Sequence, residues 1–140
     1  MPIYTASPIA MQINVLEYFE KGALLKCRDK VAVKEQNREY TFAEIERFAK
    51  HCATLILKRT STGRQPVPVF LPKSGQSIVA DIGSVYSGNG YANLDIKSRP
   101  QRLKGMLDNL NPDVIVTSAQ RVAGLKAMSV RGISVEGSRG

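Results

Sequence analysis

The chain has 140 residues, with 20 Lys and Arg against 12 Asp and Glu, which gives a formal net charge of +8. This length suits a single domain, and 43% hydrophobic with 23% charged residues is close to the globular average. The composition therefore argues against a disordered chain and excludes a collagen and a coiled coil, and two cysteines are too few for a disulfide scaffold.

The positive charge is spread along the chain rather than clustered. Lys and Arg are scattered over 26–34, 47–59 and 97–104 without a run of five, and acidic residues such as Asp29, Glu35 and Glu46 lie among or next to them. The chain also has no Trp for base stacking. We interpret the charge as a solvated basic surface and do not expect a nucleic-acid partner. No signal peptide or membrane-spanning run of about 18 apolar residues is present, so a cytoplasmic location and no membrane partner are expected.

The first elements are predicted to be an arm, a helix and a hairpin. Residues 1–12 contain two prolines and are predicted to form an extended arm. Asn14, with Glu17 three residues later, resembles a capping box and predicts a helix whose apolar pattern ends near Cys27. Its apolar stripe is Val15, Leu16, Phe19, Ala23 and Leu24. Short strands at 31–33 and 39–41, joined by a polar turn, predict a β-hairpin.

A second capping box, Thr41 to Glu44, opens the clearest helix of the chain. One apolar face of this helix is expected to contain Phe42, Ile45, Ala49, Cys52 and Ile56. Cys52 on that face is predicted to be a buried, reduced thiol. The neighbouring His51 points about 100° away from Cys52 in a helix, so the two cannot form a nucleophile–base pair.

From residue 67 onward, strands alternate with helices. Strands are predicted at 67–71, 91–94, 114–117 and 133–135, and helices at 78–86, 99–110 and 120–126. Pro68 lacks an N–H, so we expect it at the start of its strand or on an edge strand. The apolar positions of the first helix are Ile78, Val79, Ile82, Val85 and Tyr86, with Gly88 as a left-handed cap. The predicted fold is α/β: an N-terminal helix and β-hairpin, then β-α units forming a largely parallel sheet.

Three short motifs stand where ligands could bind. Gly88-Asn89-Gly90 lies between a helix and a strand, the reverse of a dinucleotide fingerprint, and is interpreted as a turn. Pro72-Lys73-Ser74-Gly75 follows a strand and opens a helix, as anion sites do, but lacks the glycine pattern of a P-loop, so Ser74 is interpreted as an N-cap. Asp95 follows a strand, where it could contact a ligand or form a turn. No catalytic, cofactor-binding or metal-binding residue is predicted.

Three ordered segments between residues 13 and 120 carry a family likeness. The first is Asp29-Lys30-Val31-Ala32-Val33 with Tyr40-Thr41-Phe42-Ala43-Glu44-Ile45, the second is Val69-Phe70-Leu71-Pro72-Lys73-Ser74, and the third runs from Tyr86 to Asp95 and on to Pro100-Gln101-Arg102-Leu103. They resemble the DKxAV…xTYxEL, VxLxKS and KAGxAYVPLDPxxPxxRL motifs that open the adenylate-forming (AMP-binding) ligase superfamily. The closest motif form is that of nonribosomal peptide synthetase adenylation domains and D-alanine-activating ligases. Asn93 and Ile96 replace the two prolines of the motif, and Tyr86 replaces its Lys.

The resemblance implies an enzyme that uses ATP and Mg²⁺ to convert a carboxylate into an acyl-adenylate and then transfers it to a carrier-protein or CoA thiol. The family's phosphate loop, ribose-binding Asp and lid Lys all follow the segments matched here, and no SGTTGxPK-like stretch occurs in the chain. We therefore expect residues 13–140 to be an N-terminal subdomain truncated before the phosphate loop. Alone it should be inactive and bind no cofactor. Its partner would be the remainder of the enzyme.

Two further expectations concern association. A subdomain cut from a larger sheet should expose a strand edge or an apolar face and should associate with itself. The alternative function is a free-standing basic α/β module that binds a protein or nucleic acid without catalysis.

Overall fold

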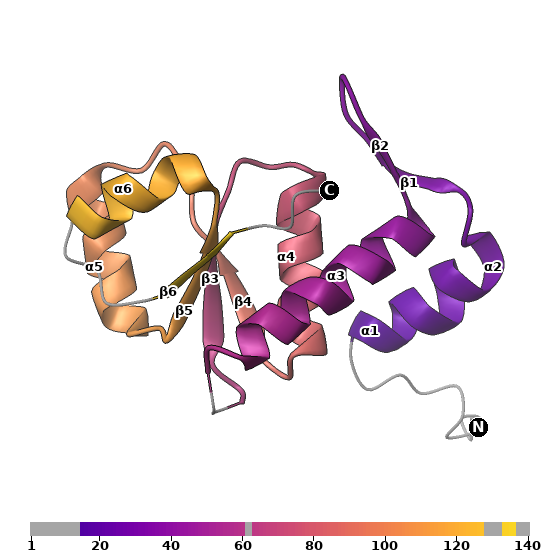
Figure 1. Cartoon of the computed structure of the whole chain (residues 1–140), viewed down its shortest axis with the longest axis horizontal. Helices are drawn as coiled ribbons and strands as arrows, with labels where there is room; N and C mark the ends of the chain where they lie inside the picture. Colours follow the sequence, from indigo (N-terminus) through magenta and orange to yellow (C-terminus); the bar gives the residue numbers. More distant parts are fainter. Residues whose placement is uncertain (1–14, 61–62, 128–132, 137–140) are drawn as a thin grey trace, which may run out of the picture.

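A computed structural model describes residues 15–60, 63–127 and 133–136. An N-terminal helical segment and a two-stranded hairpin lie beside an α/β unit with helices on both faces of its sheet (Figure 1). The elements are α1 (Val15–Tyr18), η3 (Phe19–Leu24), α2 (Leu25–Cys27), β1 (Val31–Lys34), β2 (Glu39–Thr41), α3 (Phe42–Leu57), β3 (Pro66–Phe70), α4 (Gly75–Tyr86), β4 (Gly90–Asn93), α5 (Pro100–Leu110), β5 (Val114–Thr117), α6 (Ala119–Ala127) and β6 (Ile133–Glu136).

The sheet has the order β4-β3-β5-β6, and all its strand pairs are parallel. This confirms the predicted α/β class and the alternation of strands with helices. Residues of β3 and β5 alternate between two cores: Val69 and Val116 pack with the residues of α3 and α4, whereas Phe70 and Ile115 pack with those of α5 and α6. The helices accordingly cover opposite faces of the sheet (Figure 1).

Pro68 does not lie at a strand start or on an edge strand, so that prediction is wrong. It is fully buried in the middle of β3, which has β4 on one side and β5 on the other. Gly90 N donates to the Gln65 carbonyl and Leu94 N to the Val69 carbonyl, so odd-numbered residues of β3 face β4 and Pro68 faces β5. The pairing with β5 begins only at Val69. Pro68 therefore precedes the first residue of β3 that pairs with β5, and its lack of an N–H costs no hydrogen bond between these two strands.

The N-terminal helix is confirmed, but its middle, η3, is a π-helical turn that shifts which residues face the core. Leu24 is buried as predicted, and Phe19 lies 6.4 Å from Phe42 between ring centroids. Val15, predicted on the apolar stripe, is instead 56% exposed. The proposed Asn14 cap and the 1–12 arm lie outside the described residues.

The caps and turns behave as their residue types predict. Thr41 Oγ1 accepts a hydrogen bond from Glu44 N at 3.1 Å, and β1 and β2 pair antiparallel. Gly88 has φ +84° after α4, and Asn111 ends α5 in the left-handed conformation. None of the helices in the described part of the chain is long and apolar enough to cross a membrane.

Helices α3 and α4 pack against each other at close range through small residues. Gly83 of α4 faces α3 so closely that a Cβ there would lie 2.8 Å from the Ala49 carbonyl oxygen and 2.9 Å from Cys52 Cβ. Ser84 beside it is completely buried, whereas Ile78, predicted on the inward stripe, is 37% exposed. The contact of α4 with α3 is therefore made through small residues, whereas Val79 of α4 contributes a larger apolar side chain to the core.

Replacing Gly83 by Ala should lower the free energy of unfolding by about 1–3 kcal/mol, because the new methyl group must push α3 away. The matched control is Gly105→Ala in α5, where a Cβ would meet nothing within 4 Å. That change should raise the free energy of unfolding by about 0.5–1 kcal/mol, since alanine is the better helix residue. Urea unfolding of both variants tests the packing, and equal effects would contradict it.

Candidate functional site

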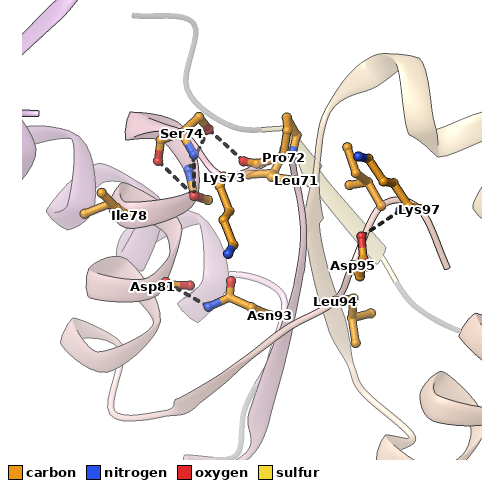
Figure 2. Close-up of a pocket in the computed structure, with 12 residues that line it drawn as sticks. Leu71, Pro72, Lys73, Ser74, Ile78, Asp81, Asn93, Leu94, Asp95 and Lys97 are labelled. Atoms are coloured by element: carbon orange, nitrogen blue, oxygen red, sulfur yellow. Dashed lines mark hydrogen bonds between the residues drawn. The ribbon is translucent and has the colours of Figure 1, made fainter. Parts of the chain in front are cut away.

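A cleft lies at the carboxyl ends of β3 and β4, where open α/β sheets bind their ligands (Figure 2). Its volume is about 910 Å³. The walls are the loop after β3, the exposed side of α4 and the loop after β4. The lining residues are Leu71, Pro72, Lys73, Ser74, Ser77, Ile78, Asp81, Asn93, Leu94, Asp95, Ile96 and Lys97.

The loop after β3 is held by hydrogen bonds within the first turn of α4. Ser74 is the N-cap, as predicted: its Oγ accepts from Ser77 N, while Ser77 Oγ accepts from Ser74 N. The two hydroxyls also donate to backbone carbonyls, Ser74 to Pro72 and Ser77 to Ser74. Both serines are therefore committed to shaping the turn.

A carboxylate of the chain itself occupies the anion position at the start of α4. Glu35, which follows β1, accepts a hydrogen bond through Oε1 from Gly75 N. A carboxylate is favoured at a helix N-terminus because it meets free N–H groups and the positive end of the helix dipole. Tyr40 of β2 also packs against Gly75 so closely that a Cβ would lie 2.3 Å from its ring. Because Gly75 has no side chain, the hairpin can approach the start of α4. The Glu35 carboxylate of the same chain then occupies the position at which an external anion would bind to Pro72-Lys73-Ser74-Gly75.

The half-buried carboxylate of Asp81 is the most unusual group in the cleft. Asn93 Nδ2 donates to Asp81 Oδ2 at 3.0 Å, whereas the buried Oδ1 has no hydrogen-bond partner among the described residues. Burial raises the pKa of Asp81 above its ordinary value, and the Asn93 hydrogen bond offsets part of that rise. Figure 2 shows Lys73 extending from the turn toward these two side chains.

Asp95 acts as a turn residue. Its Oδ1 accepts from Lys97 N at 2.9 Å, which closes the loop after β4, and its side chain is exposed at the cleft. The structure therefore shows the turn-forming role that the sequence left open, and it also places Asp95 on the cleft wall opposite Lys73 (Figure 2).

The remaining motifs lie away from the cleft. Asn89 in the Gly88-Asn89-Gly90 turn is buried, where its Oδ1 accepts from Gln65 N and its Nδ2 donates to Ser87 Oγ, so this is a structural turn as predicted. Cys52 is buried and unpaired, and burial raises the pKa of its thiol to about 11. The exposed His51 does not activate it. Within the described ranges no cluster of His, Cys, Asp and Glu could hold a metal ion.

Sequence reasoning missed the Asp81–Asn93 pair and the role of Glu35. Asp81 stands between Ile78 and Ile82 and looks like any solvated helix position, while Glu35 and Gly75 are 40 residues apart. The one available signal was Asn93, which departs from the proline of the family motif. The cleft offers hydrogen-bond donors and acceptors beside the apolar lining residues Leu71, Leu94 and Ile96, a combination that suits the binding of a ligand.

A family model described as AMP-binding enzyme matches residues 19–137. Among curated relatives, the nonribosomal peptide synthetase dtxS1 of Metarhizium robertsii is 26% identical over 91 residues, which are 65% of this chain and 1% of that protein. The chain thus spans a very small part of that relative's length.

Two solved structures share the fold. ATP-bound MatB from Rhodopseudomonas palustris superposes with a TM-score of 0.76 at 18% identity, over 91% of this chain and 26% of that chain. The nonribosomal peptide synthetase FmoA3, in its α-methyl-L-serine-AMP bound form, gives a TM-score of 0.75 at 18% identity, over 87% of this chain and 13% of that chain.

Replacing Asn93 by Leu should destabilise the fold by about 1 kcal/mol at about pH 7, because Asp81 then loses its donor. The loss raises the pKa of Asp81 further, so the penalty is present where the carboxylate is ionised and fades as pH falls through that pKa. Urea unfolding at about pH 7 and about pH 3 measures the difference. In an Asp81→Asn background the pH-dependent part should vanish; its persistence would assign the effect to another group.

Proposed function

Because the chain belongs to the AMP-binding enzyme family, we propose that it is the N-terminal α/β subdomain of an ATP-dependent, AMP-forming ligase. In this proposal the whole enzyme activates a carboxylate as an acyl-adenylate and passes it to a thiol. The observation that carries the proposal is the family match over residues 19–137, which coincides with the hairpin, the sheet and its helices.

The proposed substrate class is an amino acid. Support comes from the similarity to a nonribosomal peptide synthetase and from the fold shared with FmoA3, which was solved with an aminoacyl-AMP. The Pro100-x-Arg102-Leu103 form, which opens α5, also leans toward the amino-acid-activating branch of the motif. The thiol acceptor would then be a carrier protein, with CoA as the alternative.

The chain's proposed role in that enzyme is to support the reaction rather than perform it. The hydroxyls of Ser74 and Ser77 in the cleft are used in the cap of α4, and Glu35 accepts a hydrogen bond from the N-terminus of that helix. A separate phosphate loop would hold ATP and Mg²⁺. Residues 13–140 would form the scaffold, with residues 1–12 as an arm, and the chain alone would not form an adenylate. The alternative of a basic binding module gains no support from the family match.

Adenylation is tested by ATP–pyrophosphate exchange with Mg²⁺ and the standard amino acids. We expect the chain alone to give no exchange above background, with an intact adenylation domain as the positive control. Exchange by the chain alone would contradict its role as a scaffold.

A chimera gives the complementary test. Residues 19–137 would replace the matching segment of a nonribosomal peptide synthetase adenylation domain, with a segment-deleted domain as the control. The chimera should keep measurable exchange, and the deletion should have none. A folded chimera that binds ATP but gives no exchange would overturn the proposed scaffold function.

A further inference from the structure

Strand β4 has a free outer edge. It is the terminal strand in the order β4-β3-β5-β6 that the described residues form. Its inner side is saturated, because Gly90 N and Leu94 N both donate to carbonyls next to or within β3. Since main-chain groups alternate sides along a strand, Tyr91 and Asn93 turn their N–H and C=O groups away from β3. These groups form a row available for pairing with another strand.

Nothing in β4 blocks that pairing. Edge strands are ordinarily protected by proline, lysine or a bulge, but β4 reads Gly-Tyr-Ala-Asn, carries no charge and pairs with β3 in unbroken register. The family motif has proline where this chain has Asn93, so an N–H is present here that the motif lacks. This departure makes the outer edge of β4 competent to donate at both outward positions.

Apolar side chains lie next to the outer edge of β4, on the face of the sheet that α4 covers. Asn93 bonds to Asp81 of α4, so Asn93 and Tyr91, two residues apart, point to that face. Tyr91 is 47% exposed, and Ile78 of α4 is 37% exposed. Partly buried Ile82 and Val85 continue the row along α4. Apolar surface would thus be buried beside any strand that joins the edge.

We propose that β4 pairs antiparallel with β4 of a second copy of this chain, across a two-fold axis at Ala92. Tyr91 of each copy then lies opposite Asn93 of the other, and the two pairs exchange about four N–H···O bonds. The four-stranded sheets join into one, and the α4 helices meet side by side and antiparallel, so their dipoles attract. A second copy fits better than a charged partner because the uncharged edge is complementary to itself.

The interface is small, so we expect a reversible dimer with a dissociation constant of about 10–100 µM. Sedimentation velocity from about 5 to about 500 µM measures it. The outward amides of Tyr91 and Asn93 should become protected from hydrogen exchange as concentration rises, whereas the Ala92 amide should be protected throughout. A monomer across this range would overturn the proposal.

Asn93→Pro and Asn93→Ala form a matched pair. Both remove the hydrogen bond to Asp81, but only proline removes the outward N–H, at a position where the family motif tolerates proline. Asn93→Pro should weaken dimerisation at least about tenfold, and Asn93→Ala should leave it within about twofold, with unchanged circular dichroism. Equal dimerisation of the two variants would overturn the pairing of β4.

A second pair keeps the test valid if Asn93→Pro fails to fold. Tyr91→Lys places like charges near the two-fold axis and should weaken the dimer at least about tenfold. Leu25→Lys is the control, because Leu25 is 77% exposed on α2, distant in the fold from β4 (Figure 1). If Leu25→Lys abolishes dimerisation and Tyr91→Lys does not, the N-terminal helix is the interface and the proposal is wrong.

Discussion

The attachment of the hairpin to the first turn of α4 determines how the cleft is shaped. Glu35 accepts from Gly75 N, and the ring of Tyr40 occupies the space where any other residue at 75 would place its Cβ. Burial raises the pKa of the Tyr40 hydroxyl above its ordinary value. Arg38 lies over the same ring at 4.4 Å. The loop 71–74 is therefore clamped between β3 and the hairpin, and its residues can form a stable cleft wall.

The same clamp limits what the cleft can do. A helix N-terminus after a parallel strand is the usual place to bind a phosphate, but here its first N–H groups are used by Glu35, Ser74 and Ser77. Two further polar side chains of the cleft lie deeper along the same helix, where Asp81 of α4 accepts a hydrogen bond from Asn93 of β4. This arrangement is consistent with the supporting role that we propose for the chain in an AMP-binding enzyme.

Local signals predicted the fold well where one residue type decides the backbone. Thr41 and Ser74 as N-caps and Gly88 in the left-handed region all follow from short-range chemistry. Errors arose where distant packing decides. Ile78 is exposed because α4 meets α3 through Gly83 and Ser84. Pro68 is tolerated in a central strand because β3 and β5 begin to pair only at Val69, the residue after it.

The candidate site was harder to predict than the fold, since its contacts join residues that no periodic pattern relates. The Glu35–Gly75 contact spans 40 residues, and the Asp81–Asn93 bond joins a helix to a strand across a turn. Only comparison with the family motif singled out Asn93, and then as a departure rather than as a site.

That departure has two separable consequences. The side chain of Asn93 supplies the donor that a half-buried Asp81 requires, while its backbone N–H faces away from the sheet. A proline at 93 would remove both groups, so it would leave the half-buried Asp81 without its donor and the outer edge of β4 without the N–H of residue 93. Asp81 and Asn93 therefore form a unit, and fixing the Asn93 backbone by strand pairing would also fix the donor on which the cleft carboxylate depends.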